Sequence, residues 1–274
     1  MREKNIIITG GTDGIGLALT KRLLKDEFNR VIIIGKNETK GNKIIKDINS
    51  NKIDFFQCDL SEKSEIIKLS EKLLKLDKID CLINNAGAIF EKREINSHGI
   101  EKTFALNHLS YFHLSILLLN KLEESGRPKI INVSSNAHKR YNLNLNDLEN
   151  KNNYNHWKAY CQSKLLNVFF SNIFSSKVKS KITCNSFHPG FVNSNFGNNN
   201  SSILRFGINV LKKLFAISNE EASKTPYLLI TSKEFENISG KYFVKSKISK
   251  SSTYSLDRSI GDYVWKKSLN YINE

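Results

Sequence analysis

The chain has 274 residues, of which 39% are hydrophobic, and its formal net charge is +15. This hydrophobic content excludes an intrinsically disordered chain, and the length suits one large domain with a buried core. The positive charge would suit a nucleic-acid partner, but the lysines are scattered between apolar positions, as in LeuLysLysLeu at 211–214. No basic run alternates with aromatic residues, so we interpret the charge as a solvated surface and expect no nucleic-acid partner.

Cysteine usage and the absence of long apolar runs indicate the compartment. The four cysteines form no CxxC pair, so we interpret them as small buried residues in a reducing compartment: Cys58, Cys81, Cys161 and Cys184. The first apolar run, 6–8, is too short for a secretory signal, and no stretch approaches the ~18 apolar residues that a membrane span needs. We expect a cytoplasmic protein without a membrane span, and peripheral membrane contact stays open.

Short β-branched runs alternate with helical segments along the chain. The runs lie at residues 5–9, 31–34, 53–57, 79–84, 130–134 and 182–187. Between them, segment 61–76 places apolar residues at helical spacing behind a Ser cap and an early Glu. This alternation predicts an α/β protein with a doubly wound Rossmann fold, in which about seven parallel strands are covered by helices in three layers.

A glycine-rich turn follows the first expected strand. That strand ends at Thr9, and GlyGlyThrAspGlyIleGly then places Gly10, Gly14 and Gly16 at the start of a helix. A backbone without Cβ can turn tightly and let a pyrophosphate approach the free N–H groups of a helix N-terminus. The turn therefore indicates a dinucleotide site, although an ordinary strand-to-helix turn would also use glycine.

Three further residues fit acid–base chemistry. Tyr160 and Lys164 are four residues apart in a helical segment and share one face. A neighbouring ammonium favours phenolate, so we expect Lys164 to bring the pKa of Tyr160 toward neutrality. Ser135, at the end of the fifth expected strand, would hold a carbonyl oxygen against Tyr160. By chance, a Tyr and a Lys also take this spacing in many helices, and a Ser at a strand end is commonly a cap.

These motifs together resemble the short-chain dehydrogenase/reductase family. The resemblance rests on the glycine spacing, on Ser135, and on AsnAsnAlaGly at 84–87, TyrCysGlnSerLys at 160–164 and HisProGly at 188–190. LeuAsnHisLeu at 106–109, GlyLysTyrPhe at 240–243 and the long separation between Ser135 and Tyr160 are similar to the retinol dehydrogenase-like branch. The resemblance covers nearly the whole chain.

The resemblance implies hydride transfer between a nicotinamide dinucleotide and an alcohol/carbonyl pair. It implies one domain over 1–274, with a cofactor half at about 1–130, a catalytic and substrate half at about 131–274, and a flexible substrate loop at about 193–215. The substrate would be a hydrophobic aldehyde, ketone, retinoid or steroid-like alcohol, because apolar residues such as Phe191 and Phe196 follow the sixth strand.

The same resemblance assigns the site residues. The catalytic residues it implies are Asn107, Ser135, Tyr160 and Lys164. The cofactor-binding residues it implies are Gly10, Thr12, Asp13, Gly14, Ile15, Gly16, Lys36, Asp59, Leu60, Asn84, Ala86, Gly87, Tyr160, Lys164, Pro189, Gly190, Val192 and Ser194.

Several of these residues also have an ordinary structural interpretation. Asp59 could cap the next helix together with Ser61, Asn84 could satisfy backbone groups in a turn, and a mid-helix Asn107 could be merely exposed. The six histidines show no metal-ligand spacing, so we expect no metal. The ones within motifs are expected to be structural or to border the substrate: His108, His138 and His188.

The end of the second strand favours NADP(H) over NAD(H). A site that prefers NAD places a carboxylate there, whereas this chain has Gly35 and Lys36. Lys36 would face the 2′-phosphate as a point charge, which gives a weaker preference than the fork of an arginine. Asp13 would oppose the phosphate if it pointed inward, and we expect it to cap the helix instead.

Two rival functions remain on sequence grounds. A non-catalytic dinucleotide-binding regulator or scaffold could keep the glycine turn without needing Tyr160 and Lys164. A nucleic-acid-binding protein would rest on the net charge alone. The sequence leaves open the substrate, the direction of the reaction and whether the chain forms a homo-oligomer.

Overall fold

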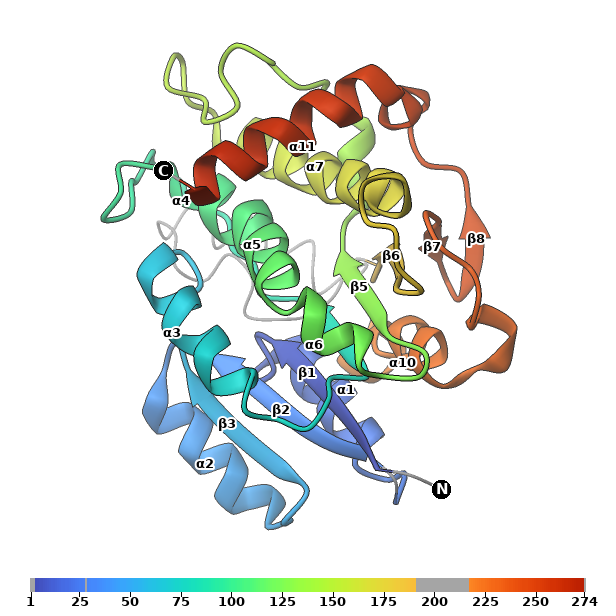
Figure 1. Cartoon of the computed structure of the whole chain (residues 1–274). Coiled ribbons are helices and arrows are strands. Elements are labelled where there is room, and N and C mark those ends of the chain that lie inside the picture. The colour runs from blue at the N-terminus through green and yellow to red at the C-terminus, as the bar shows by residue number, and fades with distance from the viewer. Residues whose placement is uncertain (1–2, 28, 191–216, 274) are drawn as a thin grey trace.

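Eight strands form one sheet in the centre of the computed structural model, which describes residues 3–27, 29–190 and 217–273 (Figure 1). The strand order is β3-β2-β1-β4-β5-β6-β7-β8. The strands are β1 (Lys4–Thr9), β2 (Asn29–Gly35), β3 (Ile53–Gln57), β4 (Cys81–Asn84), β5 (Lys129–Val133), β6 (Thr183–His188), β7 (Tyr242–Val244) and β8 (Lys247–Ser249). The strands β1 to β7 pair in parallel, so the predicted Rossmann-type α/β fold is confirmed.

An antiparallel hairpin at the sheet edge was not expected from the sequence. Strand β8 pairs antiparallel with β7, and the two strands are joined by Lys245 and Ser246. Both linking residues have positive φ, of 49° and 60°, as a tight two-residue hairpin turn requires. Neither residue is one of the Gly, Asn or Asp residues that usually mark such a turn, so the sequence carries no signal for it.

Helices cover both faces of the sheet. The longer ones are α1 (Gly14–Leu23), α2 (Glu38–Ile48), α3 (Lys63–Leu73), α5 (Ser110–Leu117), α7 (His156–Lys177), α10 (Lys224–Thr231) and α11 (Arg258–Asn273). The shorter ones are α4 (Lys102–Phe104), the π-helix η1 (Ala105–Leu109), α6 (Leu119–Glu123), the 3₁₀ helix η2 (Asn136–Lys139), α9 (Asn219–Ala222), and the 3₁₀ helices η3 (Lys233–Phe235) and η4 (Thr253–Leu256). The predicted helix over 61–76 is therefore α3, which is shorter at both ends.

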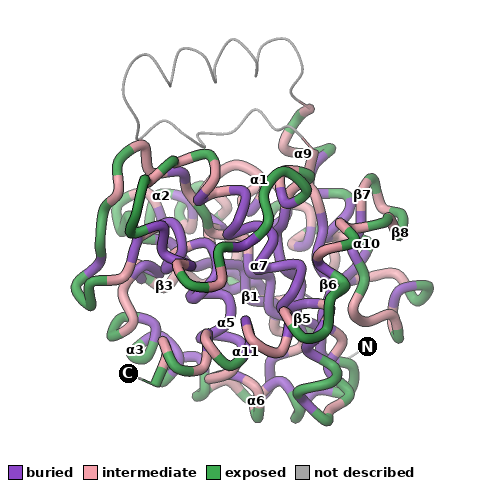
Figure 2. Tube along the Cα trace, turned by 90° about the horizontal axis from the view of Figure 1, so that it is seen from above, coloured by how far each residue is buried: buried purple, intermediate pink, exposed green. Residues whose placement is uncertain are grey.

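Successive residues of each central strand enter two separate cores. Along β1, Ile7 joins the cluster formed with α3, α5, α7 and α11, whereas Ile6 and Ile8 join the cluster formed with α1, α2 and α10. A strand that is covered on both faces is mostly apolar along its whole length, as is usual in a parallel sheet. Figure 2 shows this burial as a purple centre beneath a greener surface.

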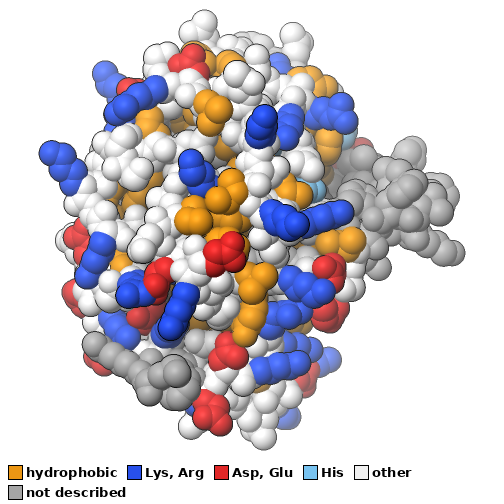
Figure 3. Space-filling view, turned by 90° about the vertical axis from the view of Figure 1, so that its right-hand side faces the viewer, with side chains coloured by type: hydrophobic (Ala, Val, Ile, Leu, Met, Phe, Trp, Pro, Cys, Tyr) orange, Lys and Arg blue, Asp and Glu red, His pale blue; other side chains and the backbone are white. Residues whose placement is uncertain are grey.

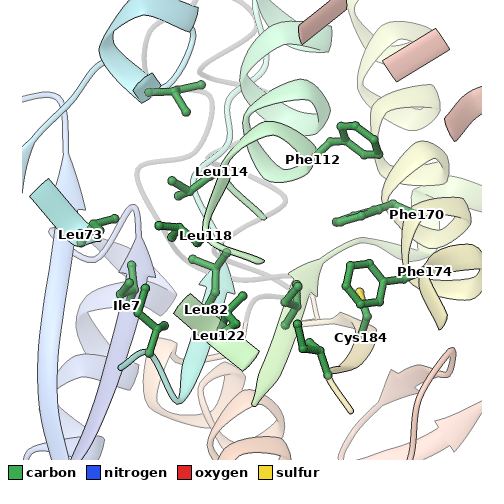
Figure 4. Packing of buried hydrophobic residues seen from close by; sticks show 14 of the residues in the cluster. Ile7, Leu73, Leu82, Phe112, Leu114, Leu118, Leu122, Phe170, Phe174 and Cys184 are labelled. Carbon is green, nitrogen blue, oxygen red and sulfur yellow. The ribbon is translucent and has the colours of Figure 1, made fainter. Parts of the chain in front are cut away.

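Aromatic side chains fill the first of these cores where α5, α7 and α11 meet. The centroid of the Phe112 ring lies 5.3 Å from that of Phe170, which lies 5.8 Å from that of Phe174 (Figure 4). The centroid of Phe112 also lies 4.9 Å from that of Trp265. Edge-to-face aromatic pairs of this kind add stability beyond the apolar area that they bury.

The surface and the cysteines agree with the expectations from composition. In Figure 3, lysines and arginines are interspersed with acidic and apolar groups over the face that is shown. All four cysteines are free and buried. Within residues 3–27, 29–190 and 217–273, no helix is long and apolar enough to cross a membrane, and no group of His, Cys, Asp and Glu side chains is arranged to hold a metal ion. The predicted substrate loop at 193–215, with Val192 and Ser194, lies outside the described residues.

We expect Phe170→Ala to lower the free energy of unfolding by about 3–5 kcal/mol, because it opens a cavity between three aromatic rings. The measurement is urea denaturation followed by circular dichroism. The matched control is Ile67→Ala on α3, where the side chain is 37% exposed, and it should cost less than about 1 kcal/mol. Equal costs for the two variants would contradict this account of the core.

Candidate active site

The predicted site residues gather at the carboxyl ends of the central strands. The glycine turn follows β1, AsnAsnAlaGly follows β4, Ser135 follows β5 and HisProGly follows β6. The strand order reverses between β1 and β4, since β2 continues from β1 on one side and β5 from β4 on the other. In open α/β sheets, ligands bind in the crevice at such a switch point.

The glycine turn is held closed by the end of β4. Gly10 has φ of 65°, and a Cβ there would lie 2.9 Å from the Cα of Ala86. A Cβ on Gly16 would collide with the carbonyl oxygen of Gly10. The side chain of Asn85 donates to the carbonyl oxygens of Thr9 (2.8 Å) and Gly10 (3.2 Å). The glycines are thus required by the turn itself, which leads directly into the N-terminus of α1.

Asn84 and Asn85 divide the roles that the sequence assigned to Asn84 alone. Asn84 is completely buried, and its amide nitrogen donates to Asn132 Oδ1 (2.9 Å) and Ser115 Oγ (3.1 Å). It therefore ties β4 to β5 and α5, and its side chain has no exposed surface. Sequence reasoning missed Asn85, whose bonds reach residues far away along the chain.

Asp59 lies at the end of β3 and forms an ion pair with Lys36. Lys36 Nζ is 2.5 Å from Asp59 Oδ2, while Asp59 Oδ1 accepts from the backbone and the hydroxyl of Ser61. Burial alone would raise the pKa of Asp59, but the hydrogen bonds from Lys36 and Ser61 hold it below its ordinary value. The N-cap of α3 is Glu62, so Asp59 and Ser61 do not cap that helix.

Asp13 caps α1, as expected, and also pairs with a lysine that the sequence did not indicate. Asp13 Oδ1 accepts from the backbone N–H of Gly14 (2.7 Å), and Asp13 Oδ2 lies 2.5 Å from Lys40 Nζ. Lys40 lies in the first turn of α2, which Asn37 caps. Gly35 leaves room for Thr12, since a Cβ on Gly35 would lie 2.9 Å from the side chain of Thr12.

Ser135, Tyr160 and Lys164 lie together at the carboxyl end of β5. The hydroxyls of Ser135 and Tyr160 share a hydrogen bond. Lys164 Nζ lies 5.7 Å from the ring centroid of Tyr160 and 5.5 Å from that of Tyr111, and it donates to the carbonyl oxygen of Val133 (3.3 Å). The ammonium is thus placed over two aromatic faces and is nearly inaccessible, with Lys164 only 2% exposed.

Burial dominates the titration of this pair. Burial raises the pKa of Tyr160 to about 12, although the hydrogen bond with Ser135 opposes the shift. Burial also lowers the pKa of Lys164 to about 7. The expectation that Lys164 brings Tyr160 toward neutrality is therefore wrong for this structure, because the loss of hydration disfavours the charged forms of both groups.

Asn107 occupies a π-helical turn, η1, between α4 and α5. Its amide accepts from the backbone N–H of Ala88 (2.9 Å) and donates to the carbonyl oxygen of Ala88 (2.9 Å) and to Ser163 Oγ (3.1 Å). A Cβ on Gly87 would lie 3.1 Å from Asn107 Oδ1 and 3.4 Å from Lys164 Nζ. Asn107 is completely buried, so the exposed alternative is wrong, and π-turns of this kind often mark functional sites.

Two of the histidines within motifs are structural links. His138 donates from Nδ1 to the carbonyl oxygen of Ser135 (2.6 Å) and accepts at Nε2 from the backbone N–H of Ser252 (3.0 Å). It thereby fastens the segment after β5 to the one after β8. His108 is completely buried and lies within hydrogen-bond distance of Asn167 and Ser268. Both interpretations as structural residues are confirmed.

The remaining predicted contacts lie around the same edge. Thr12 and Leu60 are buried, whereas Ile15, Ala86 and Pro189 are partly exposed. Gly190 has φ of 96°, and a Cβ there would lie 2.6 Å from the side chain of Ile217. The chain is thus turned sharply after β6, at the point where the predicted nicotinamide contacts begin.

The comparisons with known proteins agree with this geometry. The family pattern described as short chain dehydrogenase matches residues 4–203. Human polyprenol dehydrogenase is 32% identical over 97% of this chain and 84% of its own length, and mouse retinol dehydrogenase 13 is 30% identical over 98% and 84%.

A solved structure of an uncharacterized protein from Mycobacterium paratuberculosis superposes with a TM-score of 0.80 at 21% identity, over 99% of this chain and 94% of that one. At this identity the superposition supports the fold alone. The family pattern and the two relatives establish more: the chain belongs to the short-chain dehydrogenase family and to its retinol dehydrogenase-like branch.

Proposed function

We propose that this chain reduces an apolar aldehyde or ketone, or oxidises the corresponding alcohol, with NADP(H). The observation that carries the proposal is the hydrogen bond between Ser135 and Tyr160, with the Lys164 ammonium over the phenol ring. The residues fit a dinucleotide, because a turn whose glycines have no Cβ atoms lies directly before the N-terminus of α1. When bound, the dinucleotide supplies or accepts the hydride.

The side chains of this site have distinct tasks in the proposed reaction. Ser135 donates a hydrogen bond that polarises the carbonyl oxygen, and Tyr160 gives that oxygen a proton as the alcohol forms. With a pKa near 12, Tyr160 is a neutral phenol at physiological pH, which suits proton donation. Lys164 stabilises the phenolate that remains, since an ammonium over the ring favours the anion.

Two lysines support the preference for NADP(H). No carboxylate ends β2, and Lys36 and Lys40 lie at the end of β2 and at the first turn of α2. Lys40 also neutralises Asp13, which would otherwise repel a 2′-phosphate. Each lysine is already paired with an aspartate, so the 2′-phosphate must compete with that aspartate for the lysine ammonium. The preference for NADP(H) over NAD(H) should therefore be moderate.

The substrate we propose is an isoprenoid-type alcohol or aldehyde. Two relatives, polyprenol dehydrogenase and retinol dehydrogenase 13, act by name on polyprenol and retinol, which both carry long apolar isoprenoid tails. Farnesal is therefore a suitable first substrate, and turnover is followed by the loss of NADPH absorbance. A chain that binds NADPH but reduces no aldehyde of this class would support the rival function, a non-catalytic dinucleotide-binding protein.

Removing the phenol hydroxyl should abolish proton transfer without disturbing the fold. We expect Tyr160→Phe to lower kcat for farnesal by about 100-fold or more, the usual contribution of a positioned acid. The affinity for NADPH, measured by nucleotide fluorescence, should stay near the wild-type value. Tyr141→Phe is the control, because Tyr141 is a 40% exposed tyrosine with no partner in this site. Near-normal turnover by Tyr160→Phe would refute the assignment.

The buried ammonium of Lys164 should make stability depend on pH. Because burial lowers the pKa of Lys164 to about 7, the folded chain loses this proton at a lower pH than the unfolded chain, whose pKa is the ordinary 10.5. The wild type should therefore gain stability as the pH rises between these values. Lys164→Met removes the titrating group. The free energy of unfolding of Lys164→Met should therefore exceed that of the wild type by more at about pH 6 than at about pH 9.

Urea denaturation at both pH values provides this measurement. Lys158→Met, six residues earlier on α7, is the control and should show no such pH dependence. Lys164→Met should also have little turnover. An advantage that is the same at both pH values would show that Lys164 is not held uncharged by burial.

Reversing the charge at Lys36 should change the choice of dinucleotide. We expect Lys36→Asp to reduce the ratio of NADPH to NADH affinity by about tenfold or more, since the new carboxylate repels the 2′-phosphate. Lys46→Asp, further along α2 and exposed, makes the same change in net charge and should leave the ratio unaltered. Tighter binding of NADH than NADPH by the wild type would refute the proposed preference.

A further inference from the structure

The helix that carries Tyr160 leaves one large apolar side chain in solvent. On α7, the leucines, phenylalanines, Val168 and Ile173 are all buried, whereas Trp157 is 42% exposed. Exposing part of an indole costs hydrophobic stabilisation, and the neighbouring turns of the same helix avoid this cost. An exposed aromatic residue beside a reaction centre is a feature that often marks a binding surface.

Trp157 is in direct contact with the reacting group. Its ring is stacked on the ring of Tyr160, with a centroid distance of 5.7 Å and an interplanar angle of 25°. The two residues are three apart, so their side chains point from the same face of the helix. Asn155 caps the first turn of α7 by accepting from the backbone N–H of Lys158 (2.9 Å). This hydrogen bond fixes the backbone that carries the indole of Trp157.

The geometry points to Trp157 as a wall of the substrate site that selects a long apolar tail. This inference rests on the proposed function, because it needs Tyr160 to meet the carbonyl oxygen. A substrate whose oxygen reaches the Tyr160 hydroxyl has its next carbons beside the stacked indole. An isoprenoid tail then covers the exposed part of Trp157, whereas a short substrate ends before it can do so.

A purely supporting role for Trp157 would have a different signature. If the indole only held the Tyr160 ring in place, its removal would lower kcat for every substrate by the same factor. A substrate wall instead contributes to the binding of the tail, so its removal raises KM for long substrates alone. The comparison of two aldehydes with the same reactive end separates these roles.

The experiment measures kcat and KM for farnesal and for 3-methyl-2-butenal, which share the conjugated aldehyde and differ in tail length. We expect Trp157→Ala to reduce the ratio of kcat/KM for farnesal to that for 3-methyl-2-butenal by about tenfold, mainly through KM. Trp157→Phe should restore most of the ratio, since it keeps an aromatic face. Leu74→Ala, a 39% exposed apolar residue at the end of α3, is the control and should leave the ratio unchanged.

A second readout does not depend on turnover. The chain has two tryptophans, and Trp265 is buried between the helices of the core. Adding farnesol to the protein with NADPH, two reduced compounds that cannot react with each other, should shift the emission of the wild type to shorter wavelength, and the same addition to Trp157→Phe should not.

The outcomes distinguish the two proposals. An equal fall in kcat for both aldehydes in Trp157→Ala, or a shift that persists in Trp157→Phe, would overturn the role of Trp157 while leaving the proposed function intact. A wild type that reduces neither aldehyde and shows no emission shift would instead count against the proposed function itself.

Discussion

The burial of the Lys164 ammonium is the constraint on which the candidate site depends. A charged group that is taken out of water must be compensated, and here the partners are one carbonyl oxygen, from Val133, and the faces of Tyr111 and Tyr160. Among the described residues, no carboxylate lies within hydrogen-bond distance of Lys164. The compensation is therefore incomplete, which is why the pKa of Lys164 falls to about 7. Gly87 belongs to the same constraint, because a side chain there would crowd the ammonium and Asn107.

A network of buried amides and hydroxyls supports this arrangement through the sheet. Asn132 on β5 accepts from Asn84 on β4 and donates to Ser171 on α7, and the register pairs Asn84 with Asn132 directly. Asn167, one turn before Ser171, donates to the carbonyl oxygens of Asn107 and Val133. Asn84 Oδ1 is buried without a hydrogen-bond partner among the described residues. The other hydrogen bonds of the network favour one arrangement of the layers, because an alternative packing would leave several more buried groups without partners. The network thus links the helix of Tyr160 to the π-turn of Asn107.

The sequence predicted the features of this structure that a local sequence pattern marks, and it missed those that no local pattern marks. The first six strands were found because short β-branched runs alternate with helical segments, and β1 and β2 contain continuous apolar runs. Tyr160 and Lys164 were found because helical spacing alone places them on one face. In contrast, the three-residue strands β7 and β8 carry too few residues for a pattern, and their turn has no glycine.

The missed site residues act across the chain. Asn85 bonds to Thr9, and Lys40 reaches Asp13, but nothing in the local sequence of either residue marks the partner. For Trp157, the sequence pattern of the helix does not distinguish an exposed indole from a buried one. These roles depend on tertiary packing, which sequence periodicity does not encode.

The titration of Tyr160 shows why charge alone was a poor guide to this site. The sequence placed an ammonium near the phenol and so suggested an acidic phenol, but the same packing that brings the groups together also removes water from both. Burial disfavours the charged form of each group, so it favours both the neutral phenol of Tyr160 and the neutral amine of Lys164. A neutral phenol in contact with Ser135 is ready to donate a proton. The phenolate that follows is formed next to Lys164, whose protonation then becomes more favourable, so proton transfer from Tyr160 and charging of Lys164 are coupled.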